Sequence, residues 1–199
     1  MLDIVGRRPG VGNVSALSIL IMNRGTLFLC DTHVSPDPTA EQIAEMTVMA
    51  AEEMARIGIT AKAALLSHSD FGSTDTPSTR KMRQALTLIR ERAPGLEVDG
   101  EMNSDTALDA VIRERIFPGS RLEGAANLLI FPNLDAANIG VNLLKSAGDG
   151  LLVGPLLLGA AAPAHILTPS VTARGLLNAT ALAVVDAQQE LKADRFTPK

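Results

Sequence analysis

Short apolar runs alternate along this chain with longer segments in which apolar residues recur every three or four positions. A run at 63–67 precedes a polar loop, and Pro77 then opens a segment with Met82, Leu86 and Ile89 at helical spacing. Neighbouring parallel strands need a crossover connection, which is usually a helix. The alternation therefore predicts an α/β fold, in which a mostly parallel sheet forms the middle of three layers and helices cover both faces.

The same alternation extends over almost the whole sequence. The runs 15–22 and 26–30 are separated by three turn-forming residues and predict a hairpin. Asp37 or Thr39, with Gln42 following, predicts the N-terminal cap of a helix that ends at Gly58. Further strands are expected at 96–99, 127–131, 151–153 and 165–167, and further helices around 108–112, 139–144 and 177–191.

Helical spacing groups the apolar residues of the last two predicted helices. The first of them carries Ile139, Leu143 and Leu144. In the closing helix, a single face comprises Leu177, Ala181, Val184, Gln188 and Leu191. Such spacing is the pattern of an amphipathic helix.

Composition excludes several classes of protein. The single Cys30 cannot form an intramolecular disulfide, which fits a reducing, cytoplasmic setting. The net charge of −4 and the absence of Trp and Tyr argue against nucleic acid as a partner. We expect no membrane association either, because no apolar stretch approaches the roughly 18 to 20 residues of a spanning helix.

Polar, glycine-rich segments follow the predicted strands. They lie at 67–73, 99–101, 132–138, 154–155 and 168–170. In open parallel sheets, ligands bind beyond the carboxyl ends of the strands, so we expect these segments to converge on one edge.

The segment Ser67-x-Ser69-x-x-Gly72-Ser73 is the strongest candidate anion site. Hydroxyls and backbone N–H groups that precede a helix can hold a phosphate or a carboxylate. The same residues are also ordinary turn and cap formers, which is the alternative interpretation.

Other polar residues have simpler structural interpretations. Asp99 and Glu101 would point the same way in an extended segment, as paired catalytic carboxylates do, but a loop that hydrogen-bonds its neighbours is the favoured alternative. None of His33, His68 and His165 has a partner at ligand spacing, so we expect structural histidines and no metal site.

Two further groups of residues also have structural interpretations. The glycine-rich stretch 6–12 lacks the Lys-Ser/Thr of a phosphate-binding loop and indicates a loop or a junction. Arg80, Lys81 and Arg83 are expected on a solvated helix face.

Several segments together resemble the phosphate acetyltransferase (phosphotransacetylase) family. They read Leu-Ser-His-Ser-Asp-Phe-Gly-Ser at 66–73, Val-Asp-Gly-Glu-Met at 98–102, Phe-Pro-Asn-Leu-Asp-Ala-Ala-Asn-Ile-Gly at 131–140, and Val-Gly-Pro at 153–155 with Gly159. The resemblance implies two α/β domains of the isocitrate and isopropylmalate dehydrogenase type, with the CoA site in the cleft between them.

This chain resembles only the C-terminal part of that family. The resemblance implies one domain over 1–155, followed by a segment over 156–199 that belongs to a mostly absent first subdomain. Active members carry a Ser-Arg pair at the start of the last helix and an Asp shortly after it, whereas this chain has Thr168-Pro169 and Gly175. Asp70-Phe71 also replaces the Thr-Lys of the family loop. Because neither Pro nor Thr supplies the donors of a guanidinium, these changes argue against ordinary transacetylase chemistry.

The substituted pattern is similar to the phosphotransacetylase-like domain fused behind bacterial NADP-dependent malic enzymes. There the implied role is regulatory: the domain senses acetyl-CoA and inhibits catalytic domains that supply NADP and a divalent metal. The expected partners are acetyl-CoA or CoA, those malic enzyme domains and further copies of the chain. The residues expected to border the ligand are Ser67, Ser69, Gly72, Ser73, Asn138, Thr168, Ser170 and Arg174.

Two alternatives remain open. The chain could be a working phosphate acetyltransferase, in which Ser67, Ser69, Ser73 and Thr168 replace the missing groups. It could instead serve only in oligomerisation, with a vestigial cleft.

Overall fold

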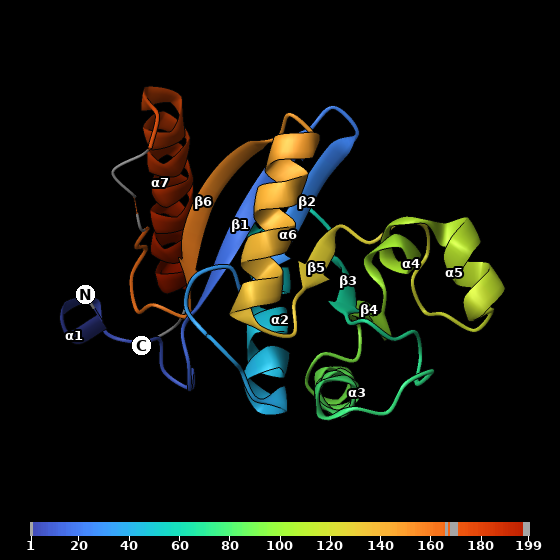
Figure 1. The fold of residues 1–199 in the computed structure, drawn as a ribbon. Helices are drawn as coiled ribbons and strands as arrows, with labels where there is room; N and C mark the ends of the chain where they lie inside the picture. The colour runs from blue at the N-terminus through green and yellow to red at the C-terminus, as the bar shows by residue number, and fades with distance from the viewer. Residues whose placement is uncertain (1, 166, 168–170, 197–199) are drawn as a thin grey trace.

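The computed structural model describes residues 2–165, 167 and 171–196, and places a six-stranded sheet between layers of helices (Figure 1). The strands are β1 (Ser15–Met22), β2 (Gly25–Cys30), β3 (Lys62–Leu66), β4 (Glu97–Met102), β5 (Leu128–Ile130) and β6 (Leu151–Leu158). The helices are α1 (Leu2–Val5), α2 (Ala40–Arg56), α3 (Pro77–Arg92), α4 (Ser104–Leu108), α5 (Ala110–Ile116), α6 (Leu134–Ala147) and α7 (Ala173–Phe196).

The sheet has the strand order β4-β3-β5-β2-β1-β6. Strands β2, β5, β3 and β4 are parallel, whereas β1 runs antiparallel to both of its neighbours, β2 and β6. The predicted mostly parallel sheet and the β1–β2 hairpin are therefore confirmed. His165 forms only an isolated bridge to Leu156 instead of the predicted strand at 165–167, and Ile166 lies outside the described residues.

Two apolar cores lie on opposite faces of the sheet. The first packs α2 and α3 against the sheet through residues such as Ile43, Met46 and Met82. The second packs α4 and α6 against the other face, where Ala107 and Val141 are buried. Figure 1 shows α6 in front of the sheet and α7 beside β6 at the sheet edge. This arrangement is the predicted three-layer fold.

Local capping explains where three of the helices begin. Thr39 accepts a hydrogen bond from Gln42 N and begins α2 with a full capping box, as predicted for one of the two candidate caps. Thr76 caps α3 in the same way, and Pro77 occupies its first turn. Asp109 accepts from Val111 N at 2.8 Å, and this cap divides the helix predicted around 108–112 into α4 and α5.

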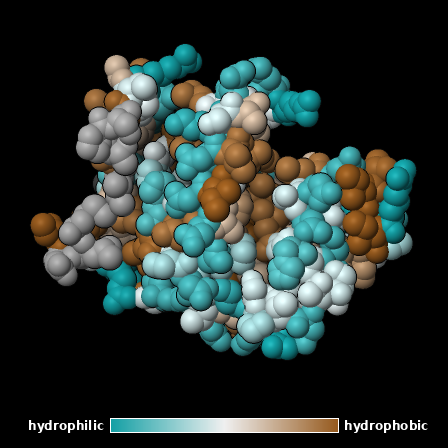
Figure 2. Space-filling model, in the orientation of Figure 1, coloured by the Kyte–Doolittle hydropathy of each residue, from teal (hydrophilic) through white to brown (hydrophobic). Residues whose placement is uncertain are grey.

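The helix expected at 139–144 forms as α6, and Leu144 packs against the second core, but Ile139 and Leu143 do not face the sheet. Ile139 and Leu143 are 61% and 64% exposed, whereas Ala137 and Val141 are buried. A Cβ atom built at Gly140 would lie 2.9 Å from the Phe131 ring, so the helix approaches the sheet too closely for large side chains. Figure 2 shows the resulting apolar strip over α6.

The apolar face predicted for α7 is also turned outward. Leu177 and Val184 are 68% and 49% exposed, whereas Ala179 is buried. The side chain of Leu191 lies outside the described part of the chain. Within the described residues, none of the helices has both the length and the apolar character needed to cross a membrane.

Candidate functional site

The polar loop 67–73, named here the serine loop, closes over the carboxyl end of β4. Ser67 N donates to Met102 O at 2.8 Å, and Phe71 N donates to Glu101 O at 2.7 Å. The Asp70 carboxylate accepts from Asn103 N at 2.8 Å and from Asn103 Nδ2 at 2.6 Å. The carboxylate that distinguishes this loop from the phosphate acetyltransferase pattern therefore anchors it to the end of the strand.

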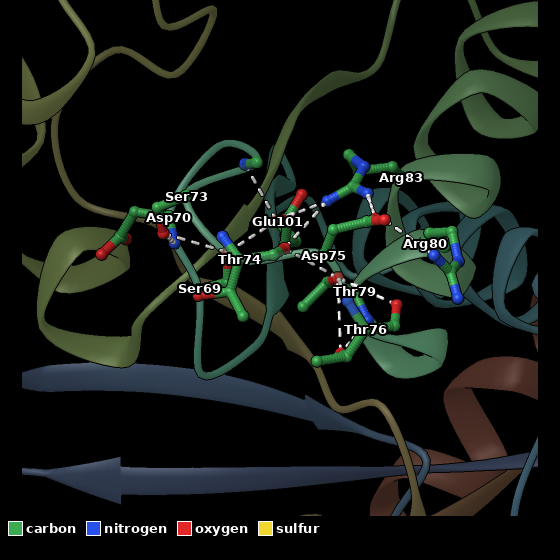
Figure 3. Close-up of polar contacts among 11 residues, drawn as sticks. Ser69, Asp70, Ser73, Thr74, Asp75, Thr76, Thr79, Arg80, Arg83 and Glu101 are labelled. Carbon is green, nitrogen blue, oxygen red and sulfur yellow. Dashed lines mark hydrogen bonds and ion pairs between the residues drawn. The ribbon is translucent and has the colours of Figure 1, made fainter.

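The hydrogen-bond donors of the serine loop converge on the carboxylate of Glu101 (Figure 3). Glu101 Oε1 accepts from Ser69 Oγ at 3.0 Å, from Gly72 N at 3.0 Å and from Arg83 Nη1 at 3.1 Å. The Glu101 side chain is fully buried, and its Oε2 atom has no hydrogen-bond partner among the described residues. The predicted anion cradle is thus formed, but the anion that it holds is the chain's own carboxylate.

The other serines of the loop have internal partners or none. Ser73 Oγ lies 3.1 Å from Ser69 Oγ and accepts from Asp70 N at 3.1 Å. Ser67 Oγ is buried without a partner in the described part of the chain. An external anion would have to displace Glu101 before it could use this loop.

Arg83 joins the serine loop to helix α3. The sequence predicted that this side chain would extend into solvent, and that prediction is wrong. Its guanidinium binds Glu101 and also Asp75, whose Oδ1 lies 2.7 Å from Arg83 Nη2. The hydrogen bond from Arg83 lowers the pKa of Asp75. Arg80, which also binds Asp75, has a side chain 57% exposed, as expected for a solvated residue.

Asp99 and Glu101 both lie within β4 rather than after it, and they do not share a site. Asp99 Oδ1 accepts from Arg90 Nη2 at 2.9 Å, while its Oδ2 accepts from Ser120 Oγ at 2.9 Å and from Arg121 N at 2.7 Å. These partners differ from those of Glu101. The hypothesis of paired catalytic carboxylates is therefore wrong, and the alternative of carboxylates that hydrogen-bond neighbouring segments holds.

A second polar region lies at the carboxyl ends of β2 and β5. The buried Asp31 begins the loop after β2, where its Oδ1 accepts from Ala16 N, His33 N and Val34 N at 3.0–3.1 Å and its Oδ2 accepts from Ser35 N at 2.9 Å. These bonds fold the loop into a fixed turn. Burial, followed by the neighbouring charge of Asp31, raises the pKa of the Cys30 thiol, so this cysteine is held as a neutral thiol.

This region contains two adjoining cavities of about 360 and 460 Å³, which share Pro36 and Asp37. Their polar lining includes Arg7 in the smaller cavity, and Lys81 and Asn133 in the larger one. We name these two cavities together the carboxyl-edge crevice. Its size falls in the range of cavities that hold small ligands and cofactors.

Lys81, like Arg7, is a residue of this crevice that sequence reasoning missed. Its side chain is only 19% exposed, and its Nζ donates to Asp37 Oδ1 at 2.5 Å and to Pro132 O at 2.9 Å. Among neighbouring basic residues, no sequence signal separates Lys81 from Arg80. The difference depends on the meeting of α3 with the loops after β2 and β5.

The remaining predicted site residues are placed less closely together. Asn138 is exposed on α6, and its Nδ2 donates to Thr32 O at 3.2 Å, which ties α6 to the loop after β2. Arg174 is exposed in the first turn of α7. Thr168 and Ser170 lie outside the described residues. Gly154 and Pro155 lie inside β6, which is longer than predicted, and therefore do not form a loop after a strand.

The three histidines occupy separate places. The His33 ring pairs with Thr32 Oγ1 at 2.9 Å, and His68 is exposed. In the described part of the chain, no three His, Cys, Asp or Glu side chains are grouped as a metal site would require. The stretch 6–12 forms a loop whose first residues pair with the end of β6, since Arg8 N donates to Gly159 O at 3.0 Å.

Comparison with known proteins identifies the family to which this chain is related. The family model described as phosphate acetyl/butaryl transferase matches residues 1–184. The chain is 60% identical over 185 residues to an NAD-dependent malic enzyme of Rhizobium meliloti and 50% identical over 189 residues to the NADP-dependent malic enzyme of Escherichia coli. These alignments cover 93% and 94% of the chain but only 24% and 25% of the two relatives.

Solved structures agree with the sequence relationship. A phosphotransacetylase from Streptococcus pyogenes superposes with a TM-score of 0.87 at 30% identity, covering 96% of this chain and 58% of that one. The chain thus spans about a quarter of the malic enzymes, where it corresponds to their C-terminal region, and somewhat over half of the phosphotransacetylase. The chain belongs to the phosphate acetyl/butaryl transferase family.

Proposed function

We propose that this chain is the acetyl-CoA-binding regulatory domain of a malic enzyme and that it binds acetyl-CoA without converting it. The parent enzyme would oxidatively decarboxylate malate to pyruvate, with NAD or NADP and a divalent metal bound by its other domains. Sequence analysis led us to expect NADP. The coenzyme is left open here because relatives with 50–60% identity carry both names.

The proposal that acetyl-CoA is not converted rests on the pairing of Glu101 with the serine loop. Phosphoryl and carboxylate ligands need free hydrogen-bond donors and are held most strongly by cationic ones. Here Ser69, Gly72 and Arg83 are all bonded to Glu101, and Asp70 stands where the family pattern has a threonine. The loop therefore offers no unpaired cation to hold a phosphate against an acetyl thioester.

The carboxyl-edge crevice is the proposed site for acetyl-CoA. It lies where open parallel sheets bind ligands, and Lys81 provides a cation for a CoA phosphate. The charged partner of Lys81 is Asp37, whose side chain is 80% exposed and can turn away into solvent, while the bond from Lys81 to Pro132 O can remain. Exchange of this ion pair for a phosphate contact costs little, because its acidic partner is exposed and pairs with such solvent access contribute at most about 1 kcal/mol.

Calorimetric titration of the chain with acetyl-CoA tests this proposal. We expect saturable binding that weakens by at least about tenfold in Lys81→Ala, since a hydrogen bond to a charged group contributes roughly 1.5–3 kcal/mol. Arg80→Ala removes the neighbouring exposed cation and is the matched control, which should bind as the unchanged chain does. Equal weakening in both variants would contradict the assignment of the site.

The main alternative is a working phosphate acetyltransferase, which the 30% identity to a phosphotransacetylase supports. An assay that follows phosphate-dependent release of CoA from acetyl-CoA, with a known phosphotransacetylase as positive control, separates the two functions. We expect no release above background. Turnover that disappears in Ser69→Ala would favour the alternative.

Homo-oligomerisation is the second alternative, and the exposed Ile139 and Leu143 on α6 favour it. Solvent-exposed apolar patches often mark contacts between proteins. Light scattering with and without acetyl-CoA measures this property. Assembly together with absence of acetyl-CoA binding would assign the chain to assembly alone.

A further inference from the structure

His165 occupies an unusual position after the end of β6. Its backbone forms an isolated antiparallel bridge with Leu156. Both of its ring nitrogens are buried, and neither has a hydrogen-bond partner within the described residues. A neutral imidazole has one N–H donor and one acceptor, and a buried group without its partner costs roughly 1–3 kcal/mol. Buried polar atoms are rarely left in this state, so the position calls for an explanation.

The ring borders a small cavity between several parts of the chain. The cavity has a volume of about 30 Å³, close to the space that one water molecule occupies. Its walls come from the N-terminal segment, from α2, from β6 with the segment 159–165 that follows it, and from α7. Such a site has room for a proton and a single water, but not for a larger ligand.

Charged residues around this cavity join three of these parts. Arg8 of the N-terminal segment binds Glu52 of α2 at 3.1 Å. Arg56 of α2 binds Glu53 at 3.1 Å and reaches Asp186 of α7 at 3.0 Å. Among the described residues, the charged groups that line this cavity together with His165 are Arg8, Glu52, Glu53, Arg56 and Asp186, and the part of β6 in the wall contributes Leu156, Leu157 and Leu158.

We propose that His165 is a proton-operated latch: its neutral ring keeps residues 160–165 and α7 docked against β6 and α2, and its protonation releases them. Each carboxylate of the cavity already binds a guanidinium group, Glu52 that of Arg8 and both Glu53 and Asp186 that of Arg56, so a new imidazolium would have to share an acceptor with an arginine. A buried cation without a partner of its own is costly, and the undocked ring recovers its hydration.

The direction of the pH dependence follows from the pKa of His165. Burial lowers this pKa, and the charge of Asp186 only partly opposes the effect. The undocked state then binds more protons than the docked state. Docking is fully favoured above the ordinary histidine pKa of about 6.5 and weakens as the pH falls below that value. Glu53 acts in the opposite direction, because burial and Asp186 raise its pKa and so reduce its charge in the docked state at low pH.

Hydrogen–deuterium exchange of the intact chain, corrected for intrinsic rates, tests the latch. Between pH 7.5 and pH 5.5 we expect the opening of α7 to increase by up to about tenfold relative to α2, because pH 5.5 is one unit below the pKa of a free histidine. His165→Phe replaces the ring by an apolar one and should remove this pH dependence while keeping α7 protected at both pH values. His68→Gln replaces an exposed histidine and should retain the pH dependence of α7 protection.

Two results would overturn the proposal. One is an α7 whose protection does not change relative to α2 over this pH range in the unchanged chain. The other is the same pH dependence in His165→Phe as in the unchanged chain, which would assign the effect to the carboxylates. If His165→Phe does not keep α7 docked, ring resonances in an NMR titration decide, since a His165 pKa at or above 6.5 would also refute the latch.

Discussion

Three buried carboxylates organise the loops at the edge of this sheet. Asp31, Asp99 and Glu101 are each at most 3% exposed, and each accepts several hydrogen bonds from backbone or side-chain donors. A buried carboxylate is tolerated only with such partners. The loop after β2, the loop before β5 and the serine loop therefore depend on single acidic residues.

Asp31→Ala should destabilise the fold strongly. The substitution leaves four backbone N–H groups without their acceptor, and we expect a loss of about 3 kcal/mol in the free energy of unfolding. Urea unfolding followed by circular dichroism measures this loss. The control is Glu91→Ala, at an exposed position near the end of α3, which should change stability by less than about 0.5 kcal/mol. Similar losses in both variants would contradict the role of Asp31.

Glu101→Gln tests whether the serine loop and Arg83 depend on the carboxylate of Glu101. The neutral amide cannot balance the charge of Arg83, and we expect a loss of roughly 1–3 kcal/mol in the free energy of unfolding. Asp75→Asn is the matched control, because it removes the exposed partner of the same arginine and should have little effect. A Glu101→Gln variant as stable as the unchanged chain would show that the serine loop does not depend on this carboxylate.

Residue spacing predicted where the serine loop lies but not what it binds. The polar residues at 67–73 directly follow a strand, and this placement is a local property. Their partner Glu101 is about 30 positions away, and its approach depends on the pairing of β3 with β4. The partial burial of Lys81 depends on three separate segments in the same way.

Among the elements, the helix starts were the most predictable features. The capping box of Thr39 and Gln42 consists of neighbouring residues, so sequence contains the whole signal. Thr39→Ala should therefore destabilise the chain by about 1 kcal/mol, measured by urea unfolding. Thr60→Ala alters an exposed threonine outside the helices and should leave stability unchanged. Equal values for the two variants would contradict the capping contribution.

The buried face of α6 was less predictable, because α6 lies so close to the sheet that small side chains are favoured on this face. Val141→Ala should cost about 2 kcal/mol in the free energy of unfolding, since it removes two buried methyl groups. Leu143→Ala removes a larger side chain that is 64% exposed and should cost much less in the isolated chain. A larger loss for Leu143→Ala would mean that this face is covered in solution.

At the scale of the whole molecule, strand direction determines where a ligand can bind. β2, β5, β3 and β4 all present their carboxyl ends at one edge, and the loops that follow them form the carboxyl-edge crevice and the serine loop. The sequence predicted that the loops at 67–73 and 132–138 would lie at this edge, but it did not include the loop after β2, and the segments 99–101 and 154–155 lie inside strands. It did not predict that one part would be closed by an internal carboxylate while the other stays open.

The most direct test of the account is an NMR titration of the ¹⁵N-labelled chain with acetyl-CoA. We predict saturable shifts of the backbone amides of Asp37, Ser78 and Asn133 at the carboxyl-edge crevice, with Gly58 and Gly95, which precede β3 and β4, unchanged. The acetyl-CoA resonances should persist unchanged in the presence of phosphate. Absence of saturable shifts, shifts centred on Gly58 and Gly95, or formation of acetyl phosphate would contradict a non-catalytic acetyl-CoA site at this edge.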